Sequence, residues 1–63
     1  MTTSQFDLRQ MVRLNAAKRV IYPDVALRPG QIERINRERR EITVWWPDRG
    51  VRINLAFDDV EAV

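Results

Sequence analysis

Two adjacent tryptophans, Trp45 and Trp46, end the apolar run ITVWW and directly precede the turn sequence PDRG. Neighbouring side chains of a β-strand point to opposite faces, so one indole enters a core only if the other points outward. An outward indole offers a flat apolar ring on which bases or cations stack. We therefore expect Trp46 to fill the core and Trp45 to contribute to a surface that something covers.

Arginine dominates the basic residues of the chain. Ten of the eleven basic residues are arginine, and Lys18 is the single lysine, in a chain whose net charge is only +2. Arginine favours planar, bidentate contacts to phosphate or carboxylate and stacks on aromatic rings, which indicates recognition. A GC-rich genome gives the same bias through codon usage, so both interpretations stay open.

The residue types that are missing exclude several kinds of chemistry. The chain has no cysteine and no histidine, which removes disulfides, Cys/His zinc sites, thiol nucleophiles and imidazole acid–base catalysis. The adjacent carboxylates Asp58 and Asp59 are more typical of a tight turn than of an acid–base pair. We therefore expect a protein that is not an enzyme, with no cofactor and no metal.

Length and hydropathy favour one small soluble domain. At 63 residues the chain is near the lower limit for a self-sufficient core. No apolar stretch approaches the roughly 20 residues of a membrane span. The first ten residues, MTTSQFDLRQ, lack the basic and apolar regions of a secretory signal. We expect a cytoplasmic protein with no membrane partner.

Alternation predicts two strands joined by a hairpin. In residues 41–46 and again in residues 51–57, apolar side chains occupy every second position. The four residues between the strands, 47–50, are expected to form the hairpin loop, with Gly50 available for a positive φ. Thr43, Trp45, Arg52 and Asn54 then share one outward face.

A third strand is expected over residues 30–36, GQIERIN. Its Ile32 and Ile35 are three positions apart, so both point inward only if the strand has a bulge near Glu33 and Arg34. The sequence RERR is a polar connection to the next strand. After the turn at residues 58–59, a short last strand through Val60 completes a meander.

The first 29 residues are more ambiguous. We expect an N-terminal arm over residues 1–10, one domain over residues 11–63, and a first strand at residues 11–14. A long loop follows over residues 15–29, in which RVIY is itself extended. The alternative is a short N-terminal helix, because Leu8, Met11, Val12 and Asn15 also fit a helical stripe.

This order of elements resembles the five-stranded SH3-like barrels of the Tudor and KOW type. Four short motifs carry the resemblance over residues 6–63: Val12 and Leu14; Gly30, Ile32 and Ile35; Val44, Trp46, Asp48 and Gly50; and Asp59, Val60, Glu61 and Val63. Only their order gives them weight. The resemblance implies an all-β, five-stranded SH3-like small barrel, and such a fold by itself does not fix a function.

The outward face is predicted to bind nucleic acid. Small barrels bind by placing an aromatic platform and flanking arginines against bases and backbone. The candidate residues are Trp45, Arg37, Arg39, Arg40, Arg49, Arg52, Asn54 and Thr43. The modest net charge argues against strong non-specific binding.

The same face also suits a protein partner or a second copy of the chain. Tudor domains hold methylated Lys or Arg in an aromatic cage, to which Tyr22 and Trp45 are candidates, but Arg49 follows the turn aspartate where such cages often have an aromatic residue. A methyl-ligand reader is therefore disfavoured, while an adaptor or inhibitor stays the alternative function. A homodimer would also compensate for the small core.

One enzyme family of small barrels resembles this chain locally. The segments GQI at residues 30–32 and VRIN at residues 51–54 are similar to two strands of the plasmid-borne, trimethoprim-insensitive dihydrofolate reductases, which are tetramers of such barrels. Their substrate-binding strand has Gln and Tyr where this chain has Arg52 and Asn54. This difference favours a binding module over an enzyme.

Overall fold

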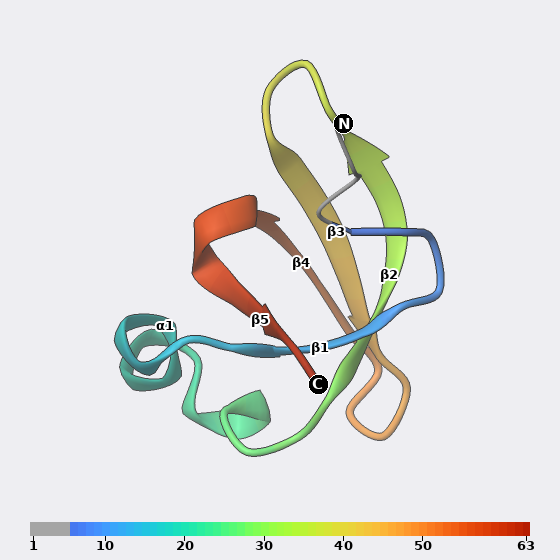
Figure 1. Ribbon diagram of the computed structural model, residues 1–63. Coiled ribbons are helices and arrows are strands. Elements are labelled where there is room, and N and C mark those ends of the chain that lie inside the picture. The colour runs from blue at the N-terminus through green and yellow to red at the C-terminus, as the bar shows by residue number, and fades with distance from the viewer. Residues whose placement is uncertain (1–5) are drawn as a thin grey trace.

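The protein forms a single antiparallel sheet of five strands in order β4-β3-β2-β1-β5, seen in a computed structural model that describes residues 6–63 (Figure 1). The strands are β1 (Met11–Leu14), β2 (Gly30–Asn36), β3 (Glu41–Trp46), β4 (Val51–Ala56) and β5 (Val60–Ala62). The connections contain a helix, α1 (Ala16–Ile21), and two 3-10 turns, η1 (Pro23–Val25) and η2 (Phe57–Asp59). The all-β expectation and the five strands are confirmed.

The sheet curls but does not close. Figure 1 shows β1 and β5 lying across one face of β3 and β4. All five strands contribute buried apolar side chains to one core. β5 returns to pair with β1, while β4 and β5 are the two edges of the described sheet. The structure therefore supports a small curled sheet, and the closed barrel is not observed.

Trp46 is the largest fully buried side chain, as the alternation predicted. Its indole Nε1–H donates to the backbone oxygen of Arg28 at 2.9 Å, so the one polar atom of the ring is satisfied. Gly30 lies directly against the ring, because a Cβ at this position would approach Trp46 Cε2 to 2.7 Å and also overlap Val44 Cγ1. The remaining core residues are Phe6, Val12, Leu14, Val25, Ile32, Ile42, Val44, Leu55, Phe57 and Val60.

The bulge expected in β2 is present. The register between β2 and β3 shifts between Ile32, which faces Val44, and Arg34, which faces Thr43. The extra residue is Glu33. Because of this insertion Ile32 and Ile35 both point toward the core, and Glu33 and Arg34 both reach the outer face.

Both hairpins of the sheet have four-residue loops with a left-handed last residue. Gly50 closes the β3–β4 loop at φ 65°, as expected from its type. Arg40 closes the β2–β3 loop at φ 57°, a conformation that a non-glycine residue adopts at some cost. The guanidinium of Arg40 lies 5.3 Å from the ring centroid of Phe57, and the Arg40 carbonyl accepts the Phe57 N–H at 2.9 Å. These contacts help to hold the strained residue.

The expectation of a long loop with an extended RVIY segment is wrong, because residues 16–21 form α1 and residues 23–25 form η1. Asn15 caps α1: its Oδ1 accepts the Lys18 N–H at 2.9 Å, and its Nδ2 donates to the Asp58 backbone oxygen at 2.7 Å. Arg19 Nε donates to the Leu14 oxygen at 3.0 Å. A six-residue helix is too short to be stable alone, so the local cap and the tertiary bond to Asp58 both help to stabilise it.

The alternative of a short helix on the stripe Leu8, Met11, Val12 and Asn15 is also wrong, since β1 occupies residues 11–14 and the short helix α1 follows it. No helix in the described part of the chain is long and apolar enough to cross a membrane.

Part of the expected N-terminal arm contributes to the core. The Phe6 ring meets the Phe57 ring edge-on, with centroids 5.4 Å apart and an interplanar angle of 74°. Phe6 is 3% exposed. Residues 1–5 of the arm lie outside the described residues, and the boundary between residues 10 and 11 stays a prediction.

Replacement of the two tryptophans separates their roles. Trp46→Ala removes a buried aromatic, which typically costs about 3–5 kcal/mol, and a domain of this size has little more stability than that. We expect Trp46→Ala to be unfolded at 25 °C by circular dichroism, and Trp45→Ala to unfold cooperatively close to the wild-type midpoint in urea. Equal destabilisation by both substitutions would contradict the assigned faces.

Candidate nucleic-acid interface

The outer face of β2, β3 and β4 brings together six polar or aromatic side chains, which we call the outer-face patch: Glu33, Arg34, Thr43, Trp45, Arg52 and Asn54. Strand register sets their order. Thr43 faces Asn54 and Trp45 faces Arg52 across the β3–β4 pair. The shared face expected for these four residues is therefore observed.

Arg52 stacks on Trp45 and is fixed by Glu33. Its guanidinium carbon lies 4.5 Å from the centroid of the Trp45 ring. Its Nε donates to Glu33 Oε1 at 2.7 Å and to Oε2 at 3.3 Å. The hydrogen bond to the Glu33 carboxylate, and then its negative charge, raise the pKa of Arg52 above its ordinary value. The guanidinium, which is charged at physiological pH in any environment, thus lies against the half-buried indole.

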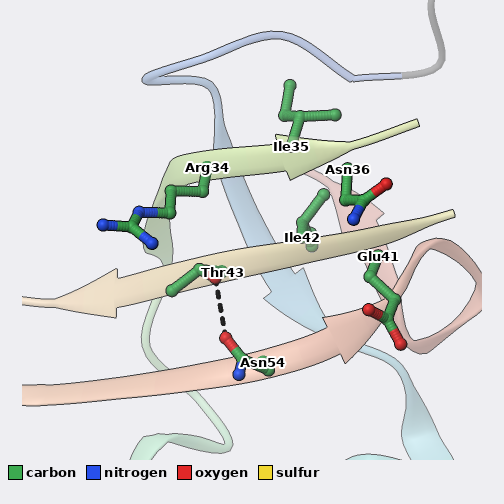
Figure 2. A pocket seen from close by; sticks show the side chains of 7 residues that line it. All are labelled: Arg34, Ile35, Asn36, Glu41, Ile42, Thr43 and Asn54. Atoms are coloured by element: carbon green, nitrogen blue, oxygen red, sulfur yellow. Dashed lines mark hydrogen bonds between the residues drawn. The ribbon is translucent and has the colours of Figure 1, made fainter. Parts of the chain in front are cut away.

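A shallow groove runs beside this stack. Figure 2 shows Thr43 and Asn54 pointing toward each other, and Thr43 Oγ1 lies 2.7 Å from Asn54 Oδ1. Because the Asn54 oxygen accepts the hydroxyl proton, its amide N–H groups remain for other acceptors. The groove is lined by Arg34, Ile35, Asn36, Glu41, Ile42, Thr43 and Asn54. An adjoining hollow extends it to Glu33 and Arg52.

Three of the predicted arginines lie in the β2–β3 loop, directly before β3. Arg37 Nη2 donates to the backbone oxygen of Phe6 at 3.1 Å and is 4.0 Å from Asp7 Oδ1. Arg40 covers the Phe57 ring. Arg39 is exposed at the tip. Arg37 and Arg40 therefore tie the N-terminal segment and η2 to the hairpin, which is a structural use that the sequence did not reveal.

The last two predicted residues lie away from the patch. Arg49 sits in the β3–β4 loop, at the opposite end of β3 from Arg39. Tyr22 packs against the core and lines a separate hollow with Val51 and Ile53, on the inner face of β4. Tyr22 and Trp45 therefore lie on opposite faces of the sheet, and they do not form an aromatic cage together.

Glu33 and Arg34 were not predicted as site residues. Both reach the patch because of the bulge, which sends two consecutive residues of β2 to the outer face. The three-residue spacing of Ile32 and Ile35 was the signal for that bulge, and it would have identified them.

Comparison of the chain with protein-family models, with curated proteins and with solved structures finds no match. We therefore infer the function from the geometry of the outer-face patch.

Removal of the Glu33 carboxylate should loosen the stack. In Glu33→Gln the charged partner of Arg52 is lost, so the guanidinium leaves the indole more often and Trp45 becomes more accessible. We expect a larger acrylamide quenching constant for tryptophan fluorescence, while buried Trp46 stays shielded. The matched control is Glu41→Gln, a carboxylate of the same groove. Equal quenching in both variants and the wild type would show that Glu33 does not order the stack.

Proposed function

We propose that this chain is a small SH3-like barrel of the Tudor and KOW type that binds single-stranded nucleic acid through the outer-face patch. The fold part of the proposal is supported by the strand order, in which a meander of four strands is followed by η2 and a short β5 that returns to β1. Curling of the sheet around one apolar core also fits a barrel of this type.

The single observation that carries the binding proposal is the position of the Trp45–Arg52 stack. The stack lies on the same open sheet face as a groove lined by hydrogen-bonding side chains. An indole beside a guanidinium offers a nucleobase a flat surface, and base–aromatic stacking is worth about 1–3 kcal/mol per base. Such stacking tolerates any base, so it favours an unpaired strand over a duplex, whose bases are already stacked.

Each side chain of the patch has a role on this proposal. Trp45 stacks with one base. Arg34 and Arg52 contact the phosphates on either side, and the amide of Asn54 donates to a base acceptor in the groove. Glu33 already occupies Arg52, so a phosphate must compete with this carboxylate. Binding is therefore weaker than the number of arginines in the sequence suggests.

Arg39 and Arg49 extend the basic surface at the two ends of β3, where a longer oligonucleotide would reach them. Arg37 and Arg40 contribute less, because both have contacts within the protein.

Titration with a short single-stranded oligonucleotide, followed by the tryptophan fluorescence of the protein and by the anisotropy of an end-labelled oligonucleotide, tests the proposal. With two or three phosphate contacts, log K should fall with log salt at a slope of about −1.4 to −2.1. Binding should then weaken by about tenfold between 50 and 200 mM salt. Trp45→Ala should abolish the change in tryptophan fluorescence on binding. It should also weaken binding by about tenfold, because one base loses its stacking partner.

Two charge-matched variants serve as controls. Arg34→Gln removes a positive charge from the patch, and Arg13→Gln removes one from β1, where Arg13 pairs with Glu61. We expect only Arg34→Gln to lower both the affinity and the salt slope. Equal effects of the two substitutions, or no binding at 20 mM salt, would overturn the proposal.

Docking of a partner protein is the second candidate function. One observation favours it: Glu33 and Glu41 line the same hollows as Arg34 and Arg52, so this surface carries both charges. Mixed charge suits a protein surface better than a polyanion. If the protein is folded by the criterion of circular dichroism and still binds no oligonucleotide, this candidate would be favoured. The expectation that the chain is not an enzyme stays a prediction.

A further inference from the structure

The open edge of β4 presents unpaired backbone groups. Phe57 N–H donates to the Arg40 oxygen at 2.9 Å, so residues 40 and 57 form a hydrogen-bonded pair of the β3–β4 ladder. Hydrogen-bonded pairs alternate along an antiparallel ladder. The odd-numbered residues of β4 therefore bond to β3, and the N–H and C=O groups of Arg52 and Asn54 point to the edge. Within residues 6–63 no further strand pairs with this edge.

The same edge is closed at its C-terminal end. The Ala56 N–H, which also points outward by this alternation, donates to Asp59 Oδ2 at 2.9 Å. A carboxylate that occupies an edge donor prevents another strand from pairing there. The available edge is thus a short segment centred on Ile53, with Arg52 and Asn54 on either side.

The inner face of this segment is incompletely covered. Val51 and Ile53 are only half-buried, although both point to the apolar side of the sheet, whereas Leu55 is 4% exposed. Beside them lies a hollow to which Ile21 and Tyr22 contribute, and Ile21 is 58% exposed. A strand added at β4 would cover these apolar groups and satisfy the backbone groups at the same time.

We propose that two copies of this chain pair through β4, antiparallel about a two-fold axis at Ile53. In this register Arg52 of one copy faces Asn54 of the other and exchanges both backbone hydrogen bonds with it. Ile53 faces its own counterpart on the inner face, and Val51 faces Leu55. On the inner face, apolar residues of one copy thus meet apolar residues of the other.

Charge and hydrogen bonding exclude the neighbouring registers. A shift that centres the axis on Arg52 places two like charges directly opposite each other, which is destabilising in a sheet. A shift that centres it on Asn54 pairs Arg52 with Ala56, whose N–H is already taken by Asp59. In the proposed register the charge of Arg52 is compensated by Glu33 of its own copy and faces a neutral amide.

A second copy also fits better than pairing of β4 with β5. β5 has only three residues, and its single ionic side chain, Glu61, already contacts Arg13 and Arg19. The β4 pairing places the two outer-face patches side by side on one continuous sheet. This inference does not depend on the ligand of the patch.

Sedimentation velocity over a range of protein concentrations tests the pairing. We expect a reversible monomer–dimer equilibrium with no larger species. Ile53→Lys places a charge at the axis and should raise the dimer dissociation constant by about 100-fold or more, because an unpaired charge is costly to bury. The control is Ile35→Lys, which changes another partly buried isoleucine, in β2 and away from the β4 edge, and should leave the dissociation constant within about threefold.

Amide hydrogen exchange identifies the edge even if a variant fails to fold. In the wild-type dimer the Arg52 and Asn54 amides should be protected, and this protection should fall on dilution while that of Ile53 persists. Fast exchange of both amides at every concentration, a monomer throughout, a ring of more than two copies, or a dimer that survives Ile53→Lys would each overturn the proposal.

Discussion

Packing of Trp46 inside the curled sheet is the constraint on which the rest of the structure depends. Its ring fills the space between β3 and β2, and only a glycine at position 30 leaves room for it. Its indole N–H fixes the backbone of Arg28 just before β2 begins. A strand that sends Trp46 inward must send Trp45 outward. The core therefore determines which indole is left to contribute to a surface.

That outward indole is ordered by charge rather than by further apolar packing. Arg52 of β4 lies on its ring, and Glu33 of β2 reaches across β3 to hold Arg52. The bulge in β2 makes this possible, because it adds a residue to the outer face at that point of the ladder. The bulge thus allows Ile32 and Ile35 to enter the core, and it also places the Glu33 carboxylate that orders the outer-face patch. Core and surface are coupled through β2.

Patterns of two-residue period made the sheet predictable from the sequence. The β3–β4 hairpin, the bulge in β2 and the opposite directions of the two tryptophans all follow from where apolar residues recur. The helix α1 was missed because its residues have no apolar stripe facing the core. Its position depends in part on the bond from Asn15 to the distant backbone of Asp58, which no local pattern encodes. Phe6 was assigned to the N-terminal arm and Val25 to the long loop, but both side chains are buried in the core.

The contacts of the arginines were equally hard to predict from the sequence. Composition indicated a basic surface, but it could not tell which guanidinium has a partner inside the fold. Arg37 contacts the N-terminal segment and Arg40 contacts η2. Arg49 lies in the β3–β4 loop, at the other end of β3. Only Arg52, among the predicted ones, joins Trp45 directly. Partners so far away in sequence become visible only in three dimensions.

The most direct test of the central claim is a map of amide and indole chemical shifts as a short single-stranded oligonucleotide is added to the isotope-labelled protein. The account predicts changes confined to the Trp45 indole and to the amides of Arg34, Thr43, Arg52 and Asn54, with the Trp46 indole unmoved. Changes concentrated around Tyr22 and α1, or spread evenly over all exposed arginines, would contradict it.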